Sequence, residues 1–524
     1  MHRTIVLLPL LLSAVSTAAD LPPNIILFYV DDLGWADTSV KMMDSDPDSA
    51  SDFHQTPHLE SLAARGMKFS CAYAPAPTCT PSRKSIQFGK TPGRLGFTFV
   101  HDVLALERDL KYGHLTSLAD VVKESDARYI TAHFGKGMGN EQMVTIGYDV
   151  TDETDGHAPN GNFHGEYVSL KDRTELPNTN AKRMGSLQKS SVEFVEQHAG
   201  RRPFFMMISH YAVHVPHAAH PDLIEKYRQL PPGRYCREED YLPESEIPRS
   251  MKISHWRLQY AAMLDEVDQG LGALVTVLSK RKQLENTLII FTSDNGGGLT
   301  PNGTLRGGKA NLYEGGLRVP FVVAGPGVLP GVQCDVPIAQ WDLLPTFYDY
   351  AGGKQPLPAD LDGGSLRSIF QSGNEGRVER ASEGFVFHYP CYFAPPVSVI
   401  RKGDYKLIEH LLTGEQKLFN VTADYREQHN ILSEHPSVAK ELKSVMGAYL
   451  QSIQAENVHD VYAARLRELD RFELTARSVH AATLRRAAGD ARLIAAASTR
   501  LEMDLKRFEQ NRKECRQQMR GTDF

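Results

Sequence analysis

Polar side chains that favour hard metal ions follow two apolar segments of the chain. Asp31 and Asp32 come directly after an apolar run of strand length, and Asp294 and Asn295 come shortly after another. A continuous apolar run is typical of a buried parallel strand, and ligands of open α/β sheets lie beyond the carboxyl ends of the strands, so we expect these four side chains to converge. Their oxygens suit Ca²⁺, with Mg²⁺ as second choice, whereas zinc ordinarily recruits histidine or thiolate.

A cysteine and several basic side chains add possible chemistry. Cys79 lies in the short motif Cys79-Thr80-Pro81-Ser82-Arg83, with Gly89-Lys90 following it. Taken alone, this motif is equally compatible with a buried thiol beside a proline turn. Four basic candidates follow other apolar segments, namely Lys136, His210, His214 and His217, and a fifth, Lys309, lies in Arg306-Gly307-Gly308-Lys309. Any one of these lysines alone would be read as an ordinary surface residue.

The order Cys-x-Pro-Ser-Arg, then a hydrophobic residue and Gly-Lys, resembles the signature of type I sulfatases of the alkaline phosphatase superfamily. Further matches to that family occur in the family's order, from about residue 23 to residue 453. They are the segments 23–34, 56–69, 293–297 and 306–320. The resemblance implies an alkaline phosphatase-like fold and a sulfuric ester hydrolase.

The resemblance implies that Cys79 is oxidised to formylglycine by a formylglycine-generating or anaerobic sulfatase-maturating enzyme. The hydrated aldehyde would attack sulfur with one oxygen, and its second hydroxyl would allow release of sulfate, a route closed to a serine or cysteine ester. Ca²⁺ would be held by residue 79 together with Asp31, Asp32, Asp294 and Asn295.

The family's motif also implies roles for the basic residues. Arg83 would hold the diol, and Lys136 and Lys309 would bind sulfate oxygens. His214 would protonate the leaving alcohol jointly with Lys309, with the nearby His210 and His217 as alternates.

One departure from the family concerns the residues after Lys136. The family usually reads Lys-Trp-His there, but this chain has Gly137 and Met138. Either His133, His210 or water would then replace the missing histidine, or turnover is impaired. Strand alternation places His133 on the same face as residues 131 and 135. Further candidates for contact with the substrate are His133, His210, His217 and His388.

The alternation of apolar runs with helical periodicity predicts an α/β fold. We expect a large mixed central sheet sandwiched by helices, a smaller C-terminal α+β domain and a helical tail. The expected strands are 23–30, 67–73, 129–134, 204–209 and 287–291, then 384–389, 397–401 and 405–409. One expected helix begins at Thr56-Pro57, and three others span 116–123, 255–278 and 437–453. The predicted limits are 20–375 for the catalytic domain, 376–455 for the second domain and 456–524 for the tail.

Composition and the N-terminus narrow the class of protein. A net charge of −6 over 524 residues gives no basic surface for nucleic acid. Residues 1–19 have a weakly basic start, a short apolar run and small residues, a pattern that predicts a signal peptide and export to the periplasm or medium. No later run reaches the length of a membrane anchor.

The six cysteines are too few and too scattered for a disulfide framework, although one or two bridges remain open. If Cys79 is reserved for chemistry, at least one other cysteine is unpaired.

The function that we expect is release of inorganic sulfate from a sulfated polysaccharide or oligosaccharide. Two alternatives remain open at this point: a phosphonate or phosphate ester hydrolase of the same superfamily, and a glycan-binding homologue that has lost catalysis.

Overall fold

The computed structural model describes most of the chain. The described residues are 21–100, 114–138, 140–152, 167–168, 175–176, 181–215, 217–234, 256–298, 302–391, 395–487 and 490–520. The predicted signal peptide and Cys236 lie outside them. The other five cysteines are unpaired. Within this part of the chain, no helix has both the length and the apolar character needed to cross a membrane.

The centre of the molecule is an eight-stranded sheet in the order β11–β2–β10–β9–β1–β8–β4–β5. Its strands are β1 (Asn24–Val30), β2 (Met67–Phe69), β4 (Ile130–Gly135), β5 (Val150–Thr151), β8 (Phe204–Ser209), β9 (Thr287–Ser293), β10 (Phe321–Ala324) and β11 (Val332–Cys334). β1 pairs in parallel with β8 and β9, whereas β10 runs antiparallel to β9. The predicted mixed central sheet is therefore confirmed.

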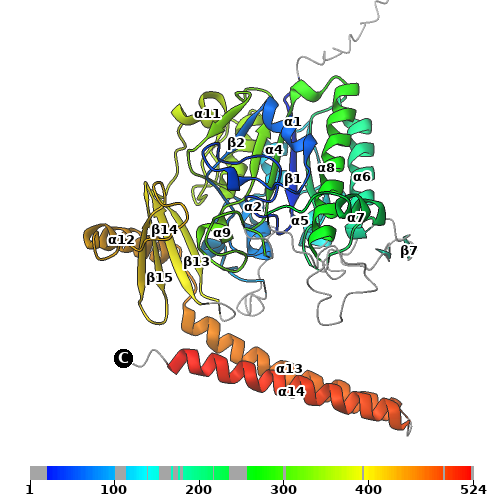
Figure 1. Ribbon diagram of the computed structural model, residues 1–524, viewed down its shortest axis with the longest axis vertical. Coiled ribbons are helices and arrows are strands. Elements are labelled where there is room, and N and C mark those ends of the chain that lie inside the picture. The colour runs from blue at the N-terminus through cyan, green and yellow to red at the C-terminus, as the bar shows by residue number, and fades with distance from the viewer. Residues whose placement is uncertain are drawn as a thin grey trace, which may run out of the picture.

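Helices cover both faces of this sheet (Figure 1), because the strands carry apolar side chains on both faces. Successive residues of β1, such as Leu27 and Phe28, belong to different cores. One core is completed by α2 (Cys79–Phe88), α4 (Leu118–Ser125), α10 (Leu343–Tyr350) and α11 (Arg367–Ser372). The other is completed by α1 (Pro57–Arg65), α6 (Met184–His198) and α8 (Trp256–Lys280). Smaller elements are β3 (Ala72–Tyr73), α3 (Pro92–Leu95), α5 (Asn140–Thr145), β6 (Tyr167–Val168), β7 (Glu175–Leu176), α7 (Pro221–Arg228), α9 (Glu314–Leu317) and β12 (Ile338–Ala339).

A second, antiparallel sheet follows, made of β13 (Phe385–Tyr389), β14 (Val397–Lys402), β15 (Tyr405–His410) and β16 (Gln416–Asn420). One face packs on α12 (Pro436–Ser452), where Leu407 of the sheet and Leu442 and Met446 of the helix belong to one apolar core. The opposite face packs on the large domain, where Phe387 lies against Trp341. The sequence predicts three of these strands and the helix. It misses β16, an edge strand with only two apolar residues.

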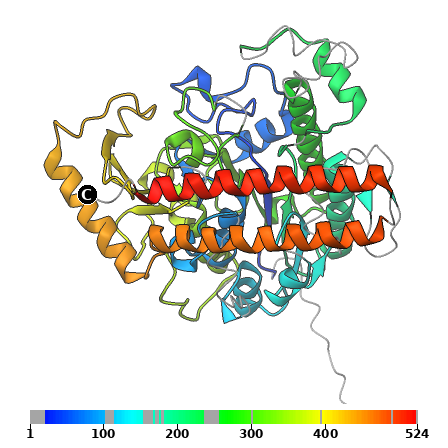
Figure 2. The ribbon, with the colours of Figure 1, turned by 90° about the horizontal axis from the view of Figure 1, so that it is seen from below.

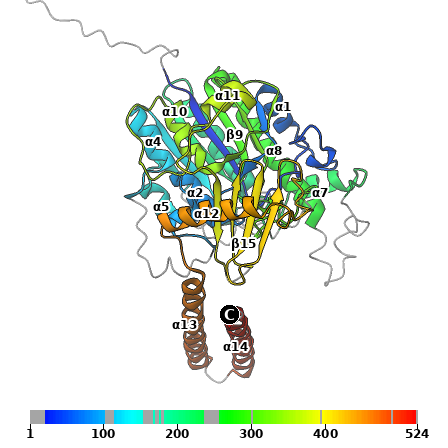
Figure 3. The ribbon, with the colours of Figure 1, turned by 90° about the vertical axis from the view of Figure 1, so that its left-hand side faces the viewer.

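The expected helical tail is a pair of antiparallel helices, α13 (Val458–Arg486) and α14 (Ala491–Arg520), which lie side by side beneath the rest of the molecule (Figures 1 and 2). Figure 3 shows the same pair nearly end-on. Arg512 of α14 pairs with Asp470 at 2.9 Å and with Glu473 at 2.7 Å on α13. The base of the pair is attached to the second sheet, where Tyr462 donates a hydrogen bond to the Cys391 carbonyl at 3.2 Å.

A buried charge network joins the second sheet to the large domain. Lys406 of β15 is 1% exposed and pairs with Glu314 at 2.8 Å and Glu427 at 2.9 Å. Glu427 also accepts a hydrogen bond from the Glu314 main-chain N–H at 2.6 Å. Because Glu314 lies five residues after Lys309, this network holds the segment that carries a predicted catalytic lysine.

Replacing Lys406 with methionine keeps the volume and leaves two buried carboxylates without their shared cation. We expect Lys406→Met to lower the free energy of unfolding by about 3–5 kcal/mol, the usual cost of breaking a buried ion pair. Urea denaturation measures it. The control is Lys440→Met on the exposed side of α12, expected to change stability by less than about 0.5 kcal/mol. An equal, small effect for both variants would contradict the account.

Candidate active site

The structure brings the four predicted metal ligands together at the carboxyl ends of β1 and β9. These strands pair with Val30 opposite Ser293, so the residues that follow them meet. The Asp32 N–H donates to Asp294 at 3.0 Å, and the Asn295 amide donates to Asp32 at 2.9 Å. Asp32 has a φ of 62°, which turns the chain sharply as it leaves β1. All four side chains are buried.

Cys79 lies at the start of α2 and faces this group. Its Sγ and one oxygen each of Asp31 and Asp294 lie within 4.8 Å of one another. The thiol is 6% exposed, and burial raises its pKa. A thiol of raised pKa is a weak nucleophile at neutral pH, so the position is poorly suited to an unmodified cysteine as the attacking group.

Arg83 lies one turn after Cys79 on α2 and therefore on the same side of the helix. Its guanidinium pairs with Asp294 at 2.7 Å, approaches Asp31 at 3.6 Å and stacks 5.1 Å from the centre of the Tyr29 ring. Burial alone would lower the pKa of Arg83, but the carboxylates of Asp294 and Asp31 raise it. The side chain is thus a permanent cation in the centre.

Two lysines complete the positive charge. Lys136, just after β4, pairs with Asp31, and Lys309 pairs with Asp32 at 2.6 Å. Burial alone would lower the pKa of Lys136, but the Asp31 carboxylate raises it. Together with Arg83, these lysines set three cations against three carboxylates.

The carboxylates do not ionise equally. Burial alone would raise the pKa of Asp31, but Lys136, His214 and Arg83 outweigh it and hold that pKa well below its usual range. Burial and the negative charge of Asp31 raise the pKa of Asp294 to about 7. Further positive charge would therefore be needed to keep every carboxylate ionised in neutral solution.

Two oxygens in this centre fit a hard cation. Asp31 Oδ1 and Asn295 Oδ1 are buried and have no hydrogen-bond partner among the described residues. Each buried polar atom without a hydrogen-bond partner costs about 1–3 kcal/mol of folding stability, so two such oxygens in one centre indicate that a ligand binds there. Carboxylate and amide oxygens are the ligands that Ca²⁺ and Mg²⁺ prefer.

The three histidines after β8 lie in different places. His214 Nε2 is 3.7 Å from Asp32, and burial lowers its pKa. His217 packs edge-on against Tyr260, 5.8 Å between ring centres. His210 packs against Phe28 at 4.7 Å, in the core on the α8 side of the sheet, opposite the α2 side that carries Arg83. Of the three, His214 has the position that suits proton transfer at the carboxylate centre.

His133 lies close to the point where the chain departs from the family. A Cβ at Gly137 would meet the His133 ring at 2.8 Å, so the absence of a side chain at residue 137 leaves room for the ring. Burial and the charge of Arg83 lower the pKa of His133 to about 3, so its imidazole is neutral. Met138 is buried in the adjoining core. Replacement of the missing histidine by His133 stays a prediction.

His388 lies in β13 of the second sheet. Both of its ring nitrogens have partners, Ser398 Oγ at 2.7 Å and the Glu456 carbonyl at 2.8 Å. These bonds account for its burial by connecting β13 to the segment before α13. Contact of His388 with a substrate stays a prediction.

Sequence reasoning missed one basic residue near the centre, Lys182. It is 1% exposed, and burial lowers its pKa to about 7, with Lys136 lowering it further and Asp31 opposing the change. Lys182 and Arg183 both have left-handed φ values, 52° and 59°, and such strain is typical of functional sites. The only sequence signal is a pair of basic residues in a polar segment without periodicity.

Comparison with known proteins identifies the family. A family model described as Sulfatase matches residues 23–353, which is more than half of the chain. The chain belongs to the sulfatase family. A second model, N-sulphoglucosamine sulphohydrolase, C-terminal, matches residues 308–456 of this sulfatase. Both matches end before α13, so the helical pair α13–α14 lies outside them.

Curated relatives and solved structures agree with this assignment. A sulfatase of Formosa agariphila is 28% identical, with 82% of this chain and 88% of the relative covered. A choline-sulfatase of Rhizobium meliloti is 28% identical over 79% of this chain and 83% of its own length. BT4656, solved in complex with its substrate D-glucosamine-2-N,6-O-disulfate, has a TM-score of 0.62 at 22% identity, covering 83% of this sulfatase and 98% of that chain. The protein is thus an enzyme, and its predicted family and fold are confirmed.

Lys182 provides a test of the charge in this centre. We expect Lys182→Met to lower kcat/KM for a sulfate ester about 10- to 100-fold, because it removes a cation near the developing negative charge. The matched control is Lys189→Met, an exposed lysine on the adjoining α6. Steady-state kinetics with thermal melting as a check of folding measures both. Unchanged kcat/KM in a folded Lys182→Met protein would show that this lysine has no part in the reaction.

Proposed function

We propose that this sulfatase hydrolyses a sulfate ester of a sulfated carbohydrate and releases inorganic sulfate, with its nucleophile derived from Cys79. The observation that carries the proposal is the position of Cys79 Sγ within 4.8 Å of oxygens of Asp31 and Asp294. Sulfate esters are poor electrophiles that carry negative charge, and here the attacking position is surrounded by buried cations.

The proposed nucleophile is formylglycine at position 79, made by a formylglycine-generating or anaerobic sulfatase-maturating enzyme. Its hydrate supplies an attacking oxygen and a second hydroxyl that permits sulfate to leave. Arg83, one turn further along α2, is the proposed donor of hydrogen bonds to the oxygens of residue 79. The raised pKa of the thiol supports a modified residue over a thiolate nucleophile.

The proposed metal is Ca²⁺, with Mg²⁺ as second choice. The residues that would hold it are Asp31, Asp32, residue 79, Asp294 and Asn295, and it would supply the positive charge that the three carboxylates require. If the carboxylates held the metal ion, Lys136 and Lys309 would no longer pair with them, and their ammonium groups would bind sulfate oxygens.

His214 is the proposed proton donor to the leaving alcohol, jointly with Lys309. Its side chain is 11% exposed and lies 3.7 Å from Asp32, at the boundary between the carboxylates and solvent. That position allows an alcohol to leave toward solvent as it takes the proton. His133 is the proposed substitute for the missing family histidine, with water as the alternative.

The proposed substrate class is a sulfated glycan, supported by the sulfated amino sugar bound to the structurally similar BT4656. The choline-sulfatase among the relatives shows that one fold serves quite different leaving groups. Export to the periplasm or medium is part of the proposal and depends on the pattern of residues 1–19.

Sulfate release by wild type and Cys79→Ala tests the nucleophile. Both are produced together with a maturation enzyme and assayed by ion chromatography on a panel of sulfated polysaccharides and their desulfated forms. We expect the variant to lose at least about 10³-fold in rate, because covalent catalysis ends. Cys334→Ala, at another buried free cysteine, is the control that should keep activity. Equal release by wild type and Cys79→Ala would exclude residue 79 as the nucleophile.

A further inference from the structure

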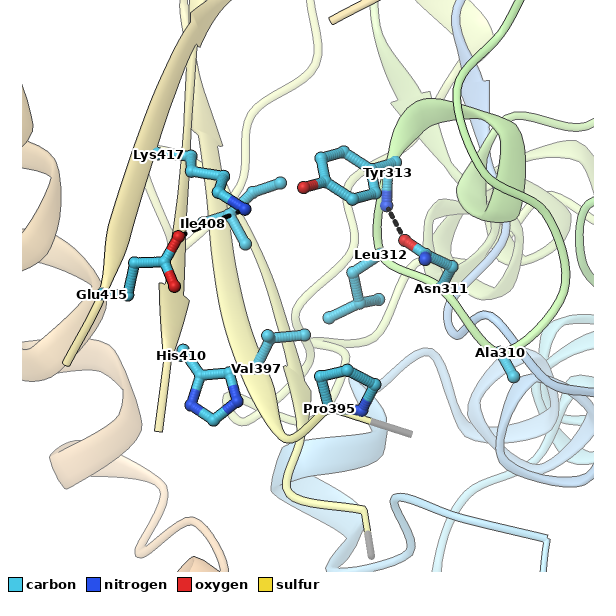
Figure 4. Close-up of a pocket in the computed structure, with 10 residues that line it drawn as sticks. All are labelled: Ala310, Asn311, Leu312, Tyr313, Pro395, Val397, Ile408, His410, Glu415 and Lys417. Atoms are coloured by element: carbon cyan, nitrogen blue, oxygen red, sulfur yellow. Dashed lines mark hydrogen bonds and ion pairs between the residues drawn. The ribbon is translucent and has the colours of Figure 1, made fainter. Parts of the chain in front are cut away.

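A pocket of about 290 Å³ lies between the segment that follows Lys309 and the second sheet (Figure 4). In Figure 4, Ala310 and Asn311 stand on one side, and His410, Glu415 and Lys417 stand on the other. Apolar side chains of β14 and β15 lie between the two sides, as Figure 4 shows for Val397 and Ile408. The volume is at the lower end of the range for small-molecule sites, about 300–1,000 Å³, and suits a single sugar ring.

The pocket adjoins the catalytic centre through Ala310. This residue follows Lys309, and its N–H donates to the Pro77 carbonyl at 2.7 Å, two residues before Cys79. Ala310 also has a φ of 65°, a left-handed conformation that is unfavourable for a non-glycine residue. The chain is therefore held in a strained turn where the catalytic lysine meets the pocket wall.

The polar groups of the pocket suit hydroxyl and anionic groups. His410 Nδ1 accepts hydrogen bonds from the main-chain N–H groups of Leu412 at 3.3 Å and Thr413 at 3.2 Å. A neutral imidazole with an accepting Nδ1 carries its proton on Nε2, so His410 has a donor left for a ligand. Lys417 pairs with Glu415 at 3.2 Å, which places an ammonium and a carboxylate at the same wall.

The opposite wall presents an aromatic ring and an amide. Tyr313 has the guanidinium of Arg306 at 4.1 Å from its ring centre, which fixes the plane of the ring. Asn311 Oδ1 accepts from the Tyr313 N–H at 3.0 Å, so the amide nitrogen of Asn311 is the group left to donate to a ligand. An aromatic ring opposite charged and amide groups is a combination that fits a hydroxylated ring.

The turn that carries His410 is supported by the helical pair α13–α14. Leu411 and Leu412 pack against Val458 and Tyr462 of α13. Because the two family models match residues 23–353 and 308–456, this support comes from a part of the chain that neither model describes. The base of the helical pair is thus placed to position one wall of the pocket.

We propose that this pocket binds the sugar unit next to the one that carries the reacting sulfate, and that Lys417 and His410 recognise an anionic substituent, sulfate or carboxylate, on that unit. The inference rests on the proposed function and deepens it. A substrate with its sulfate at residue 79 and Lys309 would extend along Ala310 into the pocket. The sulfatase would then be selective for chains over single sugars.

The test compares a small substrate with longer ones. The probes are p-nitrophenyl sulfate and size-defined oligosaccharides from carrageenan, chondroitin sulfate and heparin. In Lys417→Met and in His410→Phe, we expect kcat/KM for sulfate release from the oligosaccharide to fall about 10- to 100-fold more than kcat/KM for p-nitrophenyl sulfate, mainly through KM. Lys417→Arg should recover most of the loss. Carboxyl-reduced oligosaccharides lack the carboxylate, and selectively desulfated ones lack the sulfate on the neighbouring sugar. Wild type and Lys417→Met should have equal kcat/KM only on the substrate that lacks the recognised group.

The matched control is Lys402→Met, at another lysine of the same sheet, which pairs with Glu383 and Glu441 away from the pocket. It should leave the ratio of the two kcat/KM values unchanged. If Lys417→Met and His410→Phe leave the ratio of the two kcat/KM values unchanged, the pocket assignment is overturned. Hydrolysis of p-nitrophenyl sulfate without sulfate release from any oligosaccharide would overturn it too. Absence of sulfate release from every substrate by wild type would instead overturn the proposed function.

Discussion

Three carboxylates buried within a few residues of the strand ends repel one another unless positive charge reaches them, and the structure around them supplies that charge. Arg83 comes from α2, the helix that begins at Cys79, Lys136 from the end of β4, and Lys309 from the loop after β9. Their partners are Asp294, Asp31 and Asp32. Such pairs repay the cost of burial only when their geometry is good, which explains why the central sheet must place three separate segments together.

The loop that carries Lys309 depends on close approach of the main chain. A Cβ at Gly296 would meet the Gly315 carbonyl oxygen at 1.9 Å, and one at Gly316 would meet the Asn311 carbonyl at 1.9 Å. No side chain fits at either glycine. The Glu314–Lys406–Glu427 network then joins this tightly folded loop to the second sheet, so the small domain stabilises both the loop that carries Lys309 and the wall of the adjoining pocket.

Much of the fold could be predicted because burial leaves a clear pattern. The apolar run of β8 and the helical spacing of α8 are read directly from their residues, and a parallel sheet brings Asp31 near Asp294. Lys182 could not be found in this way, because a polar segment with left-handed φ has no periodicity. The edge strand β16 and the pocket at His410 depend on contacts between segments, and local sequence does not encode those contacts in any simple pattern.

Calcium titration by calorimetry tests whether the carboxylates of Asp31, Asp32 and Asp294, together with Asn295, form a cation-binding site. We expect one Ca²⁺ bound per chain in wild type, weaker binding of Mg²⁺, and at least a tenfold loss of Ca²⁺ affinity in Asn295→Ala. This substitution removes an amide oxygen that, like Asp31 Oδ1, has no hydrogen-bond partner among the described residues. Asn302→Ala, at a buried asparagine that bonds the main chain of Gly297, is the control for general loosening of this loop. Two results would contradict a cation site here: absence of Ca²⁺ binding by wild type, or equal Ca²⁺ affinity of wild type and the Asn295→Ala variant.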